Sequence, residues 1–155
     1  MDTHALHHYP PNAEIARWLI VAFLTGAASV LLFHQGALAL LNAAHLAARA
    51  PYSLAPTAPF GIPQVWSLAF WGGVWGIVLA EVLRRFDGGR LIGAALVFGA
   101  ILPTLIAWFV VAPMKGQPIA AGGAPKAMAV ALIVNAAWGL GTGIGLCLFG
   151  RRARH

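Results

Sequence analysis

The chain has 155 residues, of which 60% are hydrophobic and only 9% are charged, and its net charge is +6. Because a soluble domain of this length leaves much of its surface exposed, it could not hide so many apolar side chains, and the composition excludes an ordinary soluble fold. The basic residues flank apolar segments and form no run interleaved with aromatic residues, so nucleic acid is excluded as a partner. We expect a single integral membrane domain over residues 1–155, with the lipid bilayer as its solvent.

Four apolar segments are each long enough to cross the hydrocarbon core of a bilayer, which needs about 20 helical residues. They cover approximately residues 18–38, 65–83, 91–111 and 128–149. Backbone groups in hydrocarbon must be paired within the chain, and these segments are continuously apolar where barrel strands would alternate. The sequence therefore predicts an all-α protein, a transmembrane bundle of four helices.

The first span carries polar side chains toward its second end. At about 100° per residue they share one helical face, and we expect the helix to continue to Ala50, where Pro51 ends it. The residues of this stripe are His34, Gln35, Asn42, His45 and Arg49.

The stripe has two interpretations. It is either a polar pocket reached from the non-cytoplasmic side, with His34 and Gln35 at its floor, or an amphipathic interfacial helix whose polar side faces water. We favour the interfacial helix, although a histidine deep in a span should face protein or water and not lipid.

The second and fourth spans read alike. Residues 71–77 align without gaps over 138–144, which lays Trp71 over Trp138, and the paired arginines that follow each span align as well. The first and third spans match more loosely. We interpret the chain as an internal repeat, two helical hairpins in tandem that run parallel to each other across the membrane.

Glycines four residues apart lie in both aligned segments. The pairs are Gly72 with Gly76, and Gly139 with Gly143. Small residues at this GxxxG spacing make a groove that lets two helix backbones approach closely, which is how helices associate in lipid. Two arrangements remain open: the second and fourth spans pack on each other at the bundle centre, or a glycine face binds a second copy or another membrane protein.

The third and fourth spans each hold one unusual residue. Pro103 removes a backbone hydrogen bond and should kink the third helix, and Thr104 and neighbouring helices are expected to help pair the freed carbonyl group. Asn135, deep in the fourth span, is expected to bond to His34 or to join two helices. Its place in the polar pocket is therefore conditional on the stripe being a site.

The Lys and Arg residues predict the orientation. Seven lie on one side of the membrane: Arg17, Arg84, Arg85, Arg90, Arg151, Arg152 and Arg154. Three lie on the other side: Arg49, Lys115 and Lys126. Because basic residues favour the cytoplasmic side, we expect both termini in the cytoplasm. In general, the chain resembles small bacterial inner-membrane proteins of four spans.

Groups suited to catalysis are scarce. Of the acids, only Glu81 falls in a span, close enough to Arg84 and Arg85 to pair with them. The two histidines of the first span share one helix, which is unsuited to holding haem, and no zinc or nucleotide motif occurs, so we expect neither a cofactor nor an enzyme. The predicted function is that of an accessory, assembly or scaffold subunit acting through helix association. The alternative is a small oligomeric permease or channel that uses the polar stripe.

Overall fold

The structure is a computed structural model that describes residues 11–150. The first helical rod consists of α1 (Pro11–Ser29), the π-helical turn η1 (Val30–His34) and α2 (Gln35–Ala43). Two short strands, β1 (Pro56–Thr57) and β2 (Ile62–Pro63), precede α3 (Gln64–Val82). The remaining elements are α4 (Gly88–Ile106), the π-helical turn η2 (Ala107–Val111), α5 (Ala112–Met114), the 3-10 turn η3 (Ile119–Gly123) and α6 (Pro125–Phe149).

The elements form four long helical rods, each long and apolar enough to cross a membrane. Their bounds are Ala13–Ala43, Gln64–Val82, Gly88–Met114 and Pro125–Phe149. Large apolar side chains such as Leu24, Leu32 and Phe70 face outward and are more than half exposed. An apolar exterior of this kind is stable only in hydrocarbon, so the predicted all-α bundle of four helices is confirmed, and the chain is a small multi-pass membrane protein.

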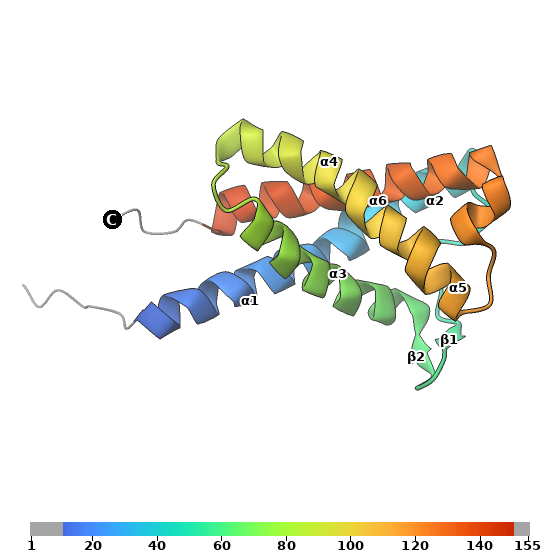
Figure 1. Ribbon diagram of the computed structural model, residues 1–155, viewed down its shortest axis with the longest axis horizontal. Coiled ribbons are helices and arrows are strands. Elements are labelled where there is room, and N and C mark those ends of the chain that lie inside the picture. The colour runs from blue at the N-terminus through green and yellow to red at the C-terminus, as the bar shows by residue number, and fades with distance from the viewer. Residues whose placement is uncertain (1–10, 151–155) are drawn as a thin grey trace, which may run out of the picture.

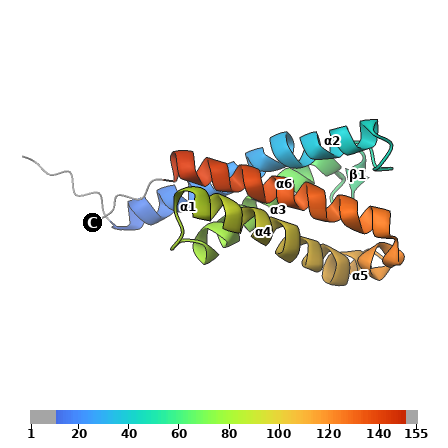
Figure 2. The same ribbon diagram turned by 90° about the horizontal axis from the view of Figure 1, so that it is seen from above.

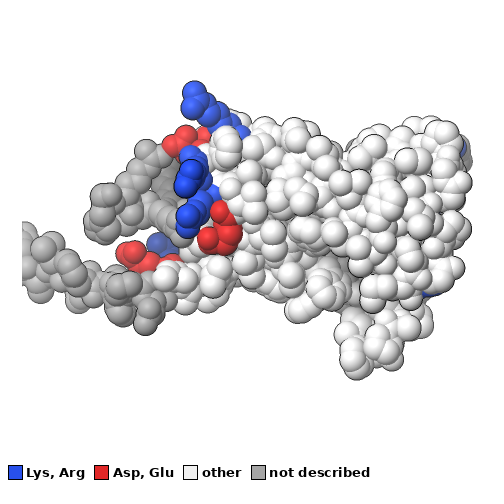
Figure 3. Space-filling model, viewed as in Figure 1, with Lys and Arg blue, Asp and Glu red and all other residues white. Residues whose placement is uncertain are grey.

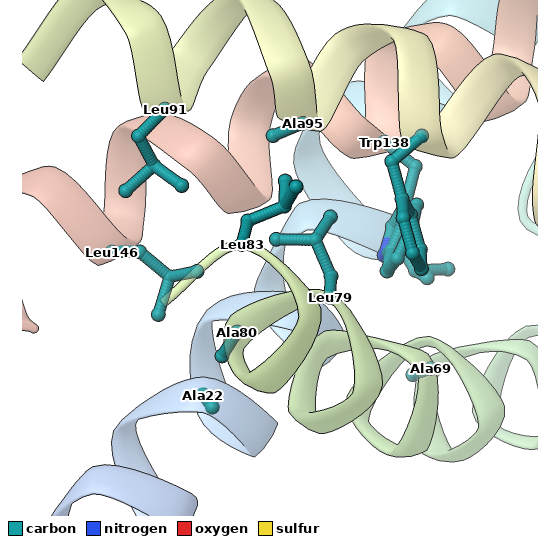
Figure 4. Packing of buried hydrophobic residues seen from close by; sticks show 11 residues of the cluster. Ala22, Ala69, Leu79, Ala80, Leu83, Leu91, Ala95, Trp138 and Leu146 are labelled. Carbon is teal, nitrogen blue, oxygen red and sulfur yellow. The ribbon is translucent and has the colours of Figure 1, made fainter. Parts of the chain in front are cut away.

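The four rods pair as two hairpins. In Figures 1 and 2, α1 lies along α3 and α4 lies along α6, and α6 also contacts the first rod from α1 to α2. Between the pairs lies a core of small and aliphatic side chains, in which Leu79 and Leu83 approach Leu91 and Trp138 (Figure 4). The helix α3 meets α4 and α6 at only a few residues, so one side of α3 stays free.

The two ends of the bundle differ. The end at which α1 begins and α6 finishes is called the termini end here, and on the face seen in Figure 3 the charged residues gather there while the long body of the bundle is free of them. The opposite end, called the loop end, carries the segments 44–63 and 115–124, the first of which contains the antiparallel pair β1–β2. Arg151, Arg152 and Arg154 lie outside the described residues.

The first helix ends earlier than expected. The prediction that it continues to Ala50 is wrong, because α2 ends at Ala43 and the chain turns at His45, whose φ is +56°. The side-chain amide of Asn42 donates to the carbonyl groups of Ala47 at 2.9 Å and Arg49 at 3.3 Å. These local bonds compete with helical ones and hold a turn in place of another helical turn.

Both hairpins begin with a helix that contains a π-helical turn. In the first rod this turn is η1, and in the second it is η2, which follows Pro103. The N–H of Ala107 approaches the carbonyl groups of both Pro103 and Thr104. Such turns widen a helix locally and often lie near functional sites.

Candidate functional site: a groove at the loop end

The glycines of α3 lie against the backbone of α1. A Cβ atom built on Gly76 would lie 2.5 Å from the carbonyl oxygen of Ala22 and 3.0 Å from the Cα of Gly26. A Cβ on Gly72 would meet the Gly26 carbonyl oxygen at 3.1 Å. Only hydrogen fits at these positions, so the two helices touch backbone to backbone.

The glycines of α6 make the corresponding contact with α4. A Cβ on Gly139 would lie 3.0 Å from the Cα of Gly99, and one on Gly143 would lie 2.8 Å from the Cβ of Ala95. The packing partners thus differ from the expected pairing of the second span with the fourth. Each glycine pair packs on the first helix of its own hairpin, although the chain between these two helices is longer than the connection between α3 and α4.

The contacts also set the register of the two hairpins. Ala22 and Gly26 contact Gly76 as Ala95 and Gly99 contact Gly139, so Trp75-Gly76 corresponds to Trp138-Gly139. The sequence alignment, which laid Trp71 over Trp138, is therefore displaced by one helical turn. The difference is visible in burial, because Trp71 is 57% exposed whereas Trp138 is 2% exposed.

Trp138 ties the two hairpins together. Its indole N–H donates to the carbonyl group of Gly26 at 2.9 Å, and its own carbonyl group accepts from the Ser29 hydroxyl at 2.6 Å. From the other hairpin, the ring of Trp75 packs edge-on against Phe98, with centroids 6.1 Å apart. Each hairpin therefore inserts one tryptophan toward the first helix of the other.

Five residues were expected in the polar pocket: His34, Gln35, Asn42, His45 and Asn135. Three of them, His34, Gln35 and Asn135, do not line the groove that the structure has at the loop end. The Gln35 side-chain oxygen accepts from the Tyr52 backbone N–H at 2.8 Å and so fixes the first loop. The Asn135 amide donates to the Thr104 hydroxyl at 2.8 Å, which joins α6 to α4 and leaves His34 without this partner. His34 is 7% exposed, and its Nδ1 atom has no hydrogen-bond partner.

The other two residues, Asn42 and His45, line an open groove of about 880 Å³ between α2, the turn after it and α6. The groove is also lined by Leu38, Ala43, Leu46, Ala47, Ala48, Arg49, Ala124, Lys126, Ala127, Val130, Ala131 and Val134. Its apolar floor is formed by Leu38 and Val134, each 2% exposed. The groove therefore has an apolar floor and a polar, basic rim.

Two cations, Arg49 and Lys126, line the groove. The Lys126 ammonium group donates to the His45 carbonyl group at 2.8 Å and so connects α6 to the turn after α2. Burial of the guanidinium lowers the pKa of Arg49 from its ordinary value, although the residue as a whole is exposed. The sequence contains no Asp or Glu between Glu14 and Glu81 or after Asp87, so no carboxylate of these segments can neutralise the rim.

Sequence reasoning placed Arg49 on the stripe but missed Lys126. The lysine is 81 residues from His45 in the chain, and only the packing of α6 against α2 brings the two together. Its one local signal is its position at the start of the fourth helix, directly after Pro125. Within residues 11–150, no group of three metal-ligating side chains comes together. Comparison with protein-family models, with curated proteins and with solved structures finds no match for this chain.

Proposed function

We propose that this membrane protein acts without catalysis, as an accessory, assembly or scaffold subunit of a bacterial inner membrane that associates with another membrane helix. Both termini would face the cytoplasm. The orientation is supported by Arg84, Arg85 and Arg90, which flank the connection between α3 and α4 at the termini end. The proposed contact surface is the outward face of α3.

The observation that carries this proposal is the position of Trp71. It is the eighth residue of the nineteen-residue helix α3, about 10 Å from the beginning of that helix, and its side chain is 57% exposed. An indole N–H is a donor only, and hydrocarbon offers it no acceptor. A partner helix would supply the missing carbonyl or side-chain oxygen.

Neighbouring side chains extend the same surface. Trp66, Phe70 and Val78 are all at least 40% exposed. At about 100° per residue, Val78 lies on the same face of α3 as Trp71, whereas Phe70 and Trp66 lie beside that face, about 100° and about 140° from Trp71. The Phe70 ring packs edge-on against Trp71 at 5.5 Å and against Phe23 at 6.0 Å, so it is held in place before any partner arrives. Rigid aromatic residues of this kind are enriched where proteins bind one another.

Comparing Trp71→Phe, Trp71→Leu and wild-type protein, each purified from native membranes in mild detergent, tests the proposal. We expect the wild type to elute as an assembly larger than a monomer, and both variants to lose the assembly while keeping monomer thermal stability. Val97→Leu is the matched control, because Val97 is a similarly exposed residue on α4 and should leave the assembly intact. A wild type that is purely monomeric under these conditions would overturn the proposal.

A second candidate function is that of a small oligomeric permease or channel. It is favoured by the buried His34, whose Nδ1 lacks a partner and which lies one helical turn below Leu38 in the groove floor. Solute flux into proteoliposomes, compared between wild type, His34→Ala and Gln35→Ala, tests this candidate. Flux that both substitutions abolish would support it, and equal leakage with and without protein would remove it.

A further inference from the structure

The groove at the loop end extends along α6 toward the middle of the bundle. Its wall along α6 runs from Lys126 at the rim to Val134 at the floor, eight residues that rise by about 12 Å. The floor is continuous with a small apolar cluster around Leu38 and Val134, to which Val130 also belongs. A volume of about 880 Å³ lies within the range of pockets that enclose small organic molecules.

The rim is already arranged to receive an anion. Lys126 donates one of its three N–H groups to the His45 carbonyl group, and this bond fixes the ammonium group beside the groove. Two N–H groups remain to bind a ligand. The Asn42 amide donates to the carbonyl groups of Ala47 and Arg49 and so fixes the turn from which Arg49 lines the groove. Guanidinium groups match the geometry of phosphate oxygens better than any other side chain.

The position of the groove selects among anions. It opens where the helices reach the end of their apolar length, at the level of lipid headgroups, and its floor is apolar. A soluble anion would leave that floor unfilled, whereas a phospholipid places a phosphate and an acyl chain in this order.

We propose that this groove binds one anionic glycerophospholipid, with its phosphate between Arg49 and Lys126 and one acyl chain along Leu38, Val130 and Val134. The groove is made by α2 and α6, whereas the association face proposed above belongs to α3. The lipid site therefore goes beyond the proposed function, and either can fail without the other.

Native mass spectrometry of the full-length protein, released from detergent with added phosphatidylglycerol or phosphatidylcholine, tests the site. We expect the wild type to retain one phosphatidylglycerol molecule and little phosphatidylcholine. Arg49→Gln and Lys126→Gln should each weaken retention about tenfold, because each removes one charge-assisted contact to the phosphate. Lys115→Gln is the matched control, since Lys115 is a cation at the same end that does not line the groove.

A second variant tests the acyl-chain part separately. Val130→Trp would fill the floor while leaving both cations in place, and we expect it to lose the lipid but keep the helical circular dichroism spectrum. Equal retention of phosphatidylcholine, or an equal loss in Lys115→Gln, would overturn the proposal. Displacement of the lipid by millimolar inorganic phosphate or glycerol 3-phosphate would overturn it as well, by showing a site for soluble phosphate.

Discussion

His34 and Gln35 are adjacent in the chain and both are buried, but their polar atoms are in opposite situations. The Gln35 side chain pairs with the backbone of Tyr52, whereas the Nδ1 atom of His34 has no partner. A buried polar atom without a partner costs about 1–3 kcal/mol, and removing one member of a formed pair exposes the other to the same cost.

We therefore expect opposite effects from two matched substitutions. His34→Leu should raise the free energy of unfolding by about 1 kcal/mol, because it removes the unpaired Nδ1 atom. Gln35→Leu should lower it by about 1–3 kcal/mol, because the Tyr52 N–H is left without an acceptor. Thermal unfolding of both variants in one detergent checks the pair. A stability loss in His34→Leu larger than in Gln35→Leu would show that His34 makes a contact that the structure does not explain.

The glycines give a second contrast between residues of one type. A Cβ on Gly139 would meet backbone atoms of α4, including the Gly99 Cα at 3.0 Å, whereas a Cβ on Gly93 would meet nothing within 4 Å. Backbone atoms cannot move aside without separating the two helices. Sequence spacing identified Gly139 as a packing residue but could not distinguish which helix it contacts.

Gly139→Ala should accordingly lower the free energy of unfolding by about 1–3 kcal/mol, the usual cost of adding an atom to a packed interior. Gly93→Ala should leave it unchanged or slightly raised, because alanine favours a helix over glycine by about 1 kcal/mol. Both values come from denaturation of the purified variants in detergent. Equal stability of the two would contradict the backbone contact between α4 and α6.

At the scale of elements, the apolar segments and their helical character could be predicted because lipid imposes a length and a pairing rule on every span. The register that relates one hairpin to the other could not be predicted from the sequence. Two Trp-Gly pairs, at Trp71 and Trp75, lie one turn apart in the second span, and only the contact of Gly76 with Ala22 shows which of them corresponds to Trp138. The end of α2 was also missed, since it depends on the Asn42 side chain bonding to a turn that had not been foreseen.

The link between α4 and α6 contains one polar pair, Asn135 with Thr104, and Thr104 has no exposed surface. Hydrogen bonds between membrane helices contribute about 0.6 kcal/mol on average and up to about 1.7 kcal/mol. In a double-mutant cycle of Asn135→Leu and Thr104→Val, we expect a coupling energy of about 1 kcal/mol. Additive effects of the two substitutions on unfolding would show that this bond contributes nothing to helix association.

At the scale of the whole molecule, charge and polarity separate along the long axis. The described acids Glu14, Glu81 and Asp87 lie at the termini end. There Glu81 accepts a hydrogen bond from the Trp18 indole at 2.7 Å, in place of the expected ion pair with Arg84 or Arg85. The described charged residues at the loop end, Arg49, Lys115 and Lys126, are all cations. The candidate groove could not be predicted from the sequence, because Lys126 and the turn at His45 are 81 residues apart in the chain.

The central claim is that four helices cross the membrane, so that both loops at the loop end lie on one side and the connection at the termini end lies on the other. Labelling of single cysteines with a membrane-impermeant maleimide in sealed vesicles of known orientation tests it most directly. The variants are Phe60→Cys, Gln117→Cys and Phe86→Cys in a Cys147→Ser background, all at exposed positions outside the spans. We expect Phe60→Cys and Gln117→Cys to react only from the non-cytoplasmic side and Phe86→Cys only from the cytoplasmic side; reaction of all three from the same side would contradict the four-span bundle.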